Sequence, residues 1–408
     1  MKIKVSELIV KYMERLGIET IFGMPGAHIL PVYDSLYDSG IESILAKHEQ
    51  GAAFMACGYA KASGRISACI TTAGPGATNL VTGIANAFAD KQPILIITGE
   101  TSTTIFGKGG LQESSGEGGS IDQGELFRSI TRYSKLIERT DYLAQVLNQA
   151  SKILLSANPG PVLLSLPFNV QKELVDADIL RNIKTKRHVY AVDKNSPPVD
   201  ALAQQISEAK HPVILAGYGC IKSGAQDIVS QLSKSLNIPV ATSLKGKGVI
   251  GDASELSLGS LGVTSDGRAY RYIVQQADMV LFLGAGFNER TSYLWDQKIL
   301  RNKKIAQIDS DPAQLEKVFE ADVAIQGDIK EVLTGVLGNL TEKGIAKKEL
   351  NGMLRHSSTP GTDNGDSYAS LSRAKFALVE KFFAELEKHF PENAFFFDDN
   401  IIFAQNFF

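Results

Sequence analysis

The 408-residue sequence has little cysteine, almost no excess charge and no long apolar run. Its three cysteines, Cys57, Cys69 and Cys220, lack metal-site spacing, which excludes a disulfide framework and suits a reducing compartment. The net charge of −3 gives no attraction to nucleic acid or to an anionic membrane surface. Because no apolar run reaches about 18 residues, we expect no membrane-spanning helix and a cytoplasmic protein.

The hydrophobic content of 44% is high enough for several buried cores. At the amino terminus, apolar residues recur at helical intervals and charges interrupt them, so residues 1–17 are predicted to form an amphipathic helix and not a signal peptide. These apolar residues are Val5, Leu8, Ile9, Tyr12, Met13 and Leu16.

Short apolar segments alternate with helical patterns along most of the chain. Such continuous apolar strands, separated by helices, are typical of parallel sheets covered on both faces. We therefore predict an α/β fold of successive doubly wound parallel-sheet domains. The predicted strands are 20–23, 43–47, 67–72, 93–100 and 161–167, and then 212–217, 239–243, 279–284 and 304–311.

Two polar, turn-rich stretches predict the domain organisation. Residues 1–170 form a first domain, 171–196 a linker, 197–338 a central domain and 339–369 a second linker. Residues 370–408 begin a third domain with a helix and end inside the apolar segment "AFFFDDNIIFAQNFF". Because an apolar strand-like end leaves an open sheet edge, we expect this domain to be incomplete and the chain to be a fragment.

Two glycine turns follow predicted strands. In "TTAGPGATN", Gly74, Pro75 and Gly76 predict a tight turn with exposed amides and a helix from about Ala77. In "FGMPGAHILP", His28 lies at the head of the next helix. Turns at the carboxyl ends of parallel strands share one crevice, where such sheets bind ligands. An ordinary strand–helix turn, and a structural histidine, are the alternatives for each motif.

Glu49 is placed between an apolar strand and the small-residue helix "EQGAAFMACGYAKAS". Burial of an unpaired carboxylate costs free energy unless a partner shares its proton. This position therefore favours a bound ligand as that partner. The alternative is a glutamate stabilised by the helix dipole. A further motif, "AGYGCIKSG", has glycines spaced too widely for a dinucleotide site, and predicts a nucleotide-sized pocket or an empty structural turn.

These motifs together resemble one family. The stretches "FGMPGAHILPVYDSLYDSGIESILAKHEQGAAFMACGYAKASG", "GPGATNLVTGIANAFADKQPILIITGE", "LQE" and "PGPVLLSLP" are similar to acetolactate (acetohydroxyacid) synthase large subunits. The central segments "PVILAGYG", "LFLGAGFNER" and "QIDSDPAQ" extend the resemblance over nearly the whole chain. These synthases use thiamine diphosphate, so the resemblance implies that residues 1–170 bind the pyrimidine ring of this cofactor.

The resemblance also implies roles for individual residues. The residue matching Glu49 hydrogen-bonds the pyrimidine nitrogen N1′ and promotes formation of the ylid. Gln112 matches a glutamine over the reacting centre, and His28 would face that centre and move protons. The cofactor-binding residues implied are Pro25, Gly26, Ala27, Glu49, Thr72, Gly74, Pro75, Gly76 and Asn79.

The implied reaction is a thiamine-diphosphate-dependent decarboxylation and carboligation of 2-keto acids, by ylid addition, loss of CO₂ and enamine attack on a second carbonyl. One alternative is a thiamine-dependent C–C lyase or cyclic-dione hydrolase. Another is a catalytically incomplete binding or regulatory fragment. A nicotinamide dehydrogenase has little support, since no acidic residue is convincingly placed after the glycine turn.

The sequence also departs from the family pattern. Asn158 and Gly286 replace arginines that hold FAD, which makes FAD a doubtful cofactor. Arg132 and Tyr133 replace a Lys-His pair near the substrate entrance, so the keto acid is undefined. Residues 111–129 form a segment that is longer and richer in glycine and serine than the corresponding family segment. This composition predicts a mobile loop at the active-site entrance.

The resemblance places the Mg²⁺ ligands in the third domain, so no metal ligand is assigned to this chain. Because family cofactor sites lie between two subunits, we expect a homodimer or homotetramer. The chain alone is expected to be inactive.

Overall fold

The computed structural model describes residues 1–186, 193, 196–350, 377–391 and 393–394. The chain divides into two compact units, Met1–Tyr190 and Ala191–Phe408, and each is described by itself.

The first unit contains a six-stranded sheet whose strands are all parallel. The strand order is β3-β2-β4-β5-β7-β6, so the chain runs outward in both directions from its middle, as doubly wound sheets do. The bounds are β2 (Thr20–Gly23), β3 (Glu42–Leu45), β4 (Ser67–Thr71), β5 (Ile94–Glu100), β6 (Tyr133–Leu136) and β7 (Val162–Pro167). The predicted parallel α/β architecture is confirmed here.

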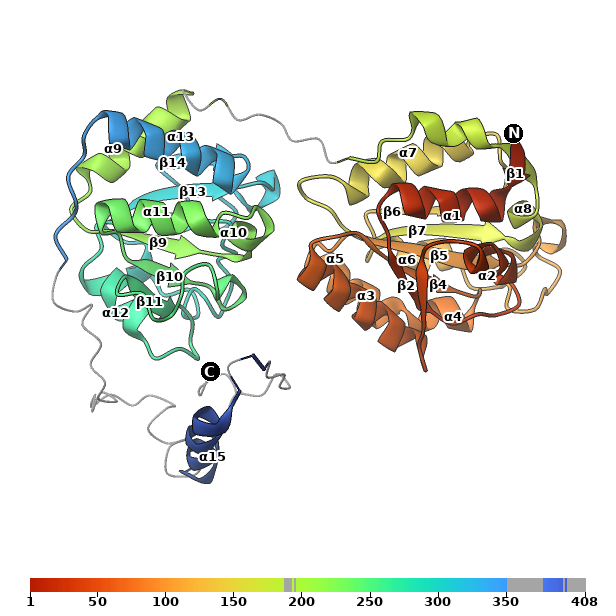
Figure 1. Ribbon diagram of the computed structural model, residues 1–408, viewed down its shortest axis with the longest axis horizontal. Coiled ribbons are helices and arrows are strands. Elements are labelled where there is room, and N and C mark those ends of the chain that lie inside the picture. Colours follow the sequence, from red (N-terminus) through yellow and green to blue (C-terminus); the bar gives the residue numbers. More distant parts are fainter. Residues whose placement is uncertain (187–192, 194–195, 351–376, 392, 395–408) are drawn as a thin grey trace. The chain divides into compact units, whose positions relative to one another are not determined.

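Helices cover both faces of this sheet (Figure 1). One face packs against α1 (Val5–Arg15), α2 (Leu30–Tyr37) and α7 (Leu143–Leu154), and the other against α3 (Glu49–Ser63) and α5 (Val81–Ala89). The amphipathic helix predicted at the amino terminus is α1, and all six of its expected apolar residues are buried. Before α1, residues Lys2–Lys4 form a short strand, β1, instead of helix.

Strand β1 pairs antiparallel with β8 (Leu174–Asp176). After β8, a short 3-10 helix covers Ala177–Asn182, and Leu180 and Ile183 are buried in the core of the first unit. The first part of the predicted linker at 171–196 is therefore packed against this unit.

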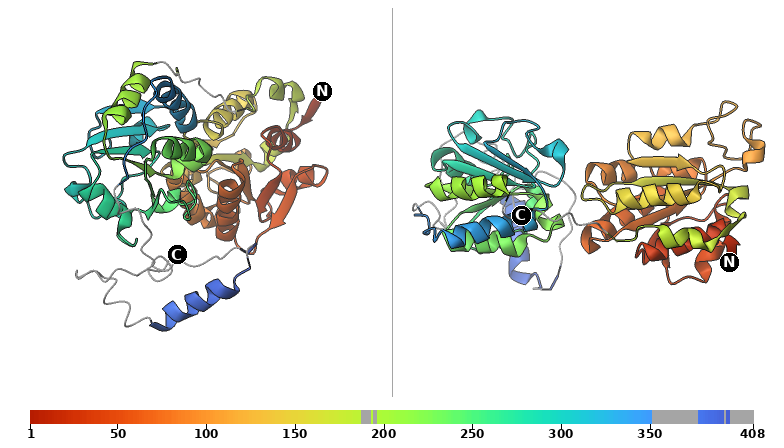
Figure 2. Two further views of the ribbon diagram at one scale, coloured as in Figure 1. Left: turned by 60° about the vertical axis from the view of Figure 1, so that its left-hand side comes forward. Right: turned by 90° about the horizontal axis from the view of Figure 1, so that it is seen from above.

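The second unit repeats the parallel pattern with the strand order β11-β10-β9-β12-β13-β14. Figure 2 gives two further views of these layers. The helices α9 (Pro197–Glu208), α11 (Gln226–Leu236) and α13 (Ile329–Glu342) share one core, and α12 (Arg268–Gln275) belongs to the core on the other face. The strands are β9 (Pro212–Ala216), β10 (Val240–Thr242), β11 (Ser257–Ser260), β12 (Met279–Leu283), β13 (Lys304–Asp309) and β14 (Val323–Gln326).

The helix predicted early in residues 370–408 appears as α15 (Ala377–His389). The strand expected near the end of the sequence lies outside the described residues. Among the residues that the structure describes, no helix is long and apolar enough to cross a membrane.

Candidate functional site

The two predicted glycine turns meet at the middle of the first sheet. The strand order reverses between β2 and β4, and ligands of open α/β sheets bind outside the carboxyl ends of strands at such a point. The turn after β2 carries Pro25, Gly26 and Ala27, and the turn after β4 carries Thr72 and Gly74. Strand pairing therefore brings both turns to one place.

The two turns approach so closely that side chains are excluded. A Cβ atom on Gly26 would lie 2.6 Å from the Cβ of Thr72, and one on Gly23 would lie 1.9 Å from the carbonyl oxygen of Ile70. The backbone amide of His28 donates to Oγ1 of Thr72 at 3.4 Å. These glycines are needed for contact between the turns, whatever else binds there.

The predicted turn at Gly74, Pro75 and Gly76 is shorter than expected. Helix α4 (Pro75–Asn79) begins two residues before Ala77, and of the three residues only Gly74 has a positive φ, 59°. Proline is preorganised for the first position of a helix, so Pro75 starts it earlier. Gly76 lies inside α4, where a Cβ would be 2.6 Å from Thr71 Oγ1 and 3.5 Å from Glu49 Oε1.

Glu49 is the first residue of α3, and its side chain is 9% exposed. The preceding strand β3 lies at the sheet edge and is largely exposed within this unit, which corrects the expectation of a strand covered on both faces. The carboxylate is also paired: Asn79 Nδ2 donates to Glu49 Oε2 at 2.9 Å. This pairing leaves the other oxygen, Oε1, beside Gly76.

Gln112 lies against the Gly74 turn in a left-handed conformation, with φ of 56°. Thr72 Oγ1 donates to Gln112 Oε1 at 3.4 Å, and a Cβ on Gly74 would lie 3.0 Å from the Gln112 carbonyl oxygen. The structure thus brings Gln112, Thr72, Gly74, Glu49 and Asn79 around one turn.

His28 is 8% exposed and lies in the turn before α2. Its carbonyl oxygen accepts from Gln171 Nε2 at 2.6 Å, and a Cβ on Gly99 would lie 2.4 Å from that oxygen. Among the described residues, no hydrogen-bond partner meets the buried Nδ1 of His28. The imidazole therefore retains hydrogen-bonding capacity at the same edge of the sheet.

Sequence reasoning missed a buried polar group beside these turns, formed by Glu100, Ser114 and Gln123. Glu100 ends β5 and is 1% exposed, and its burial raises the pKa of the carboxyl group. Ser114 Oγ donates to Glu100 Oε2 at 2.6 Å, and Gln123 Nε2 donates to Thr98 Oγ1 at 2.7 Å. The available signal was the polar ending of the strand "ILIITGE".

The segment 111–129, predicted to be a mobile loop, ends in a helix, α6 (Gln123–Arg128). Near its start, the Glu113 carboxylate accepts from the amides of Gly107 and Gly110, and the Gly107 bond above all lowers the pKa of Glu113. Mobility of the rest of this loop stays a prediction. Full protection of residues 116–121 from hydrogen exchange would contradict it.

Arg132 and Tyr133 lie at the amino ends of the strands, whereas the glycine turns lie at the carboxyl ends. This follows because Tyr133 is the first residue of β6 and all six strands run parallel. Arg132 also contacts the segment before β7, since a Cβ on Gly160 would lie 2.8 Å from the arginine side chain. Within this unit, neither residue borders the carboxyl-end site.

The motif "AGYGCIKSG" in the second unit forms a closely packed structural turn. A Cβ on Gly217 would lie 2.2 Å from the Gly284 carbonyl oxygen, and one on Gly219 would lie 2.7 Å from the Gly284 Cα. The Gly217 and Gly219 amides donate to Leu283 and Gly284 carbonyls across this contact. Backbone packing accounts for both glycines, which favours the structural alternative.

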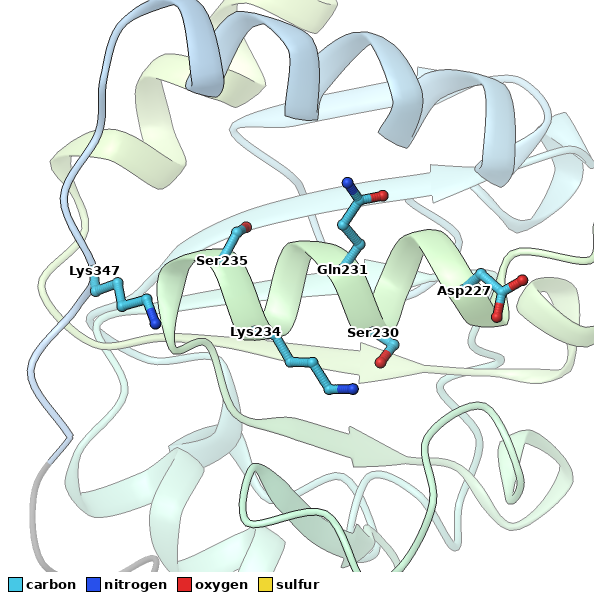
Figure 3. Close-up of a pocket in the computed structure, with 6 residues that line it drawn as sticks. All are labelled: Asp227, Ser230, Gln231, Lys234, Ser235 and Lys347. Carbon is cyan, nitrogen blue, oxygen red and sulfur yellow. The ribbon is translucent and has the colours of Figure 1, made fainter.

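Two surface hollows are lined by residues other than those of the glycine turns. One, of about 490 Å³, is on the second unit along α11 and is lined by Asp227, Ser230, Gln231, Lys234, Ser235 and Lys347 (Figure 3). The other, of about 420 Å³, borders α6 and β6 and includes Arg132 and Tyr133. In the described part of the chain, no group of three or more His, Cys, Asp or Glu side chains could hold a metal ion.

Comparisons with known proteins identify the family. Residues 3–120 match the model "Thiamine pyrophosphate enzyme, N-terminal TPP binding domain", and residues 199–336 match "Thiamine pyrophosphate enzyme, central domain". The first match contains both glycine turns of the first unit, together with Glu49, Asn79 and Gln112.

The chain is 37% identical over 350 residues to a probable acetolactate synthase large subunit of Methanocaldococcus jannaschii, covering 85% of this chain and 58% of that protein. It is 37% identical over 333 residues to the acetolactate synthase isozyme 1 large subunit of Escherichia coli, covering 81% and 57%. The chain spans about half the length of the curated relatives it matches. With both domain models matched, the chain belongs to the thiamine pyrophosphate enzymes.

Proposed function

We propose that this chain provides the pyrimidine-binding and central parts of a thiamine-diphosphate-dependent enzyme that decarboxylates and ligates 2-keto acids. The observation that carries the proposal is the Glu49–Asn79 pair beside the Gly74 turn, at the point where the strand order reverses. The relatives named acetolactate synthase support the reaction class.

The residues present fit the pyrimidine half of thiamine diphosphate. Glu49 Oε2 is held by Asn79, while Oε1 lies beside a glycine and can share a proton with a ring nitrogen. Two buried polar atoms at this edge, Thr71 Oγ1 and His28 Nδ1, have no hydrogen-bond partner in the described chain. Buried polar atoms usually have hydrogen-bond partners, and a polar ligand bound at these turns would supply partners for both.

Each proposed residue has a distinct task. Glu49 holds the ring-nitrogen proton, and its partly desolvated setting strengthens that hydrogen bond. Asn79 orients the carboxylate and Gln112 orients the keto acid, while His28 moves a proton at its carbonyl oxygen. Thiamine diphosphate supplies, when bound, the nucleophilic carbon that the amino acids lack. Contacts to the ring come from Pro25, Gly26, Ala27, Glu49, Thr72, Gly74, Pro75, Gly76 and Asn79.

We assign the diphosphate and Mg²⁺ ligands to a third domain, and expect no turnover from this chain alone. The proposed enzyme is a homodimer or homotetramer in the cytoplasm. FAD is not part of the proposal. Gly286 offers no side chain, and Asn158 offers no positive charge for a flavin phosphate.

A second candidate, a thiamine-dependent C–C lyase or cyclic-dione hydrolase, is favoured by one observation. His28 brings a buried imidazole with a vacant nitrogen to the site. An imidazole of this kind can donate a proton to a carbanion or remove one from water, as cleavage reactions require.

Product analysis tests both candidates, with the chain extended by a complete third domain and supplied with thiamine diphosphate and Mg²⁺. Acetolactate and CO₂ from pyruvate, lost in Glu49→Gln, support the first candidate. Inertness toward pyruvate with cleavage of a cyclic dione supports the second. Failure of the extended protein to bind the cofactor contradicts both and supports a binding or regulatory fragment.

A further inference from the structure

Glu100 is a buried carboxylate beside the candidate site that the pyrimidine contacts do not use. Its Oε1 accepts from the amides of Thr101 at 2.7 Å and Ser114 at 3.1 Å, and its Oε2 accepts from Ser114 Oγ at 2.6 Å. Burial of a carboxylate is costly unless such donors satisfy it. Two of these three hydrogen bonds fix Ser114, which belongs to the loop that follows β5.

Ser114 connects this carboxylate to the Gly74 turn. Its hydroxyl has one proton, and both Glu100 Oε2 at 2.6 Å and Gln123 Oε1 at 3.3 Å can accept it. The shorter contact to the carboxylate takes the proton, because charge-assisted hydrogen bonds are the stronger ones. The hydroxyl oxygen is then oriented to accept from the Gly74 amide, which lies 3.4 Å away.

Gln112 lies two residues before Ser114 and contacts the same turn. Its left-handed backbone is unfavourable for a residue with a side chain, and such conformations persist only where their surroundings hold them. The next residue, Glu113, is tied to the Gly107 and Gly110 amides, and Ser114 is tied to Glu100. The loop is therefore anchored immediately after Gln112.

We infer that Glu100 is a positioning residue that fixes Gln112 over the Gly74 turn through Ser114. This rests on the proposed function for the role of Gln112, whereas the path of hydrogen bonds belongs to the chain itself. His28 is the titratable side chain whose charge reaches Glu100, and a protonated His28 favours the ionised carboxylate.

Amide hydrogen exchange of the 408-residue chain, measured by NMR, tests the inference. Glu100→Gln replaces one acceptor oxygen with a donor, so we expect exchange at the Ser114 and Gly74 amides to become about tenfold faster through local opening. The Ile96 amide inside β5 should be unchanged. Glu117→Gln, which alters an exposed carboxylate on the same loop, is the matched control and should behave like the original chain.

A second variant and a pH series separate positioning from simple loop packing. Ser114→Ala keeps the carboxylate but removes the hydroxyl, so the Gly74 amide should exchange faster while the Thr101 amide stays protected. The Ser114 hydrogen bonds favour the ionised form of Glu100, so in the unaltered chain acid should weaken them and lower the protection of the Gly74 amide, corrected for intrinsic exchange. In Glu100→Gln that pH dependence should vanish.

Equal protection of the Gly74 amide in the unaltered chain, Glu100→Gln and Ser114→Ala would overturn the inference. So would a pH profile that Glu100→Gln leaves intact. Failure of the extended protein to bind thiamine diphosphate, with these exchange results unchanged, would contradict the proposed function alone.

Discussion

The Glu49 carboxylate is held by one side-chain amide, and this pair can be measured. Asn79→Ala removes the 2.9 Å hydrogen bond and leaves a largely buried oxygen without that partner. We expect a loss of about 1–2 kcal/mol in the free energy of unfolding. Urea unfolding of Asn79→Ala, Glu49→Ala and the double variant should give a coupling energy of about 1 kcal/mol. Additive single effects would show that the pair does not interact.

The left-handed backbone of Gln112 predicts that a functional residue here costs stability. Glycine accepts φ of 56° without strain. The free energy of unfolding, measured with urea, should therefore be about 1 kcal/mol higher for Gln112→Gly than for Gln112→Ala. Both variants lack the amide over the Gly74 turn and should lose turnover equally in the extended protein. If glycine and alanine are equally stable at this position, the strain is absent.

The pKa of Glu100 predicts a pH dependence of stability. Burial raises this pKa in the folded state, so the folded chain binds the proton more tightly than the unfolded chain. The resulting stabilisation is complete below the unfolded pKa and is lost as pH rises through the folded value. Glu100→Gln stays neutral at every pH. The free energy of unfolding of this variant minus that of the original chain should therefore be larger at pH 8 than at pH 4. Urea unfolding at both values measures this, and an equal difference at both would contradict it.

At the scale of elements, the buried strands and α1 were predictable because their periodicity reflects burial. Strand β6 was missed because its residues YSKL are all half-buried and give no apolar run. Strand β14 was also missed; it has four residues, of which only Ile325 is buried. Strand β11 includes two serines and a glycine, which favour turns over strands. The start of α4 at Pro75 followed proline's preference for the first helical position, which a reading based on glycines overlooked.

The contact between α3 and α5 predicts opposite effects for two glycines in these helices. A Cβ on Gly83 would lie 2.4 Å from the Ala53 Cβ, so Gly83→Ala should cost about 1–3 kcal/mol by overpacking. Gly58 of α3 has nothing within 4 Å of such an atom, so Gly58→Ala should stabilise by about 0.5–1 kcal/mol. Thermal unfolding of both variants measures this, and equal shifts would show that the helices are not closely packed here.

For the whole chain, the sequence was sufficient to predict parallel sheets and two glycine turns at the carboxyl ends of neighbouring strands. The pairing of Glu49 with Asn79 was not predictable from the residues alone, because it joins positions 30 residues apart on two helices. Glu100 was missed for a similar reason: Ser114 and His28, which are 14 and 72 residues away in the sequence, come near it only when the chain is folded. Local patterns predict elements, whereas such polar pairs depend on topology.

The proposed function depends above all on binding of the thiamine pyrimidine ring by Glu49 and Asn79. The most direct measurement is an NMR titration of thiamine into the 408-residue chain, following the side-chain amide of Asn79. We predict a saturable shift of this signal that is absent in Glu49→Gln. The control is Glu42→Gln, which alters an exposed glutamate of β3 and should leave the shift unchanged. An Asn79 amide that does not respond to thiamine, or that responds equally in Glu49→Gln, would contradict the claim.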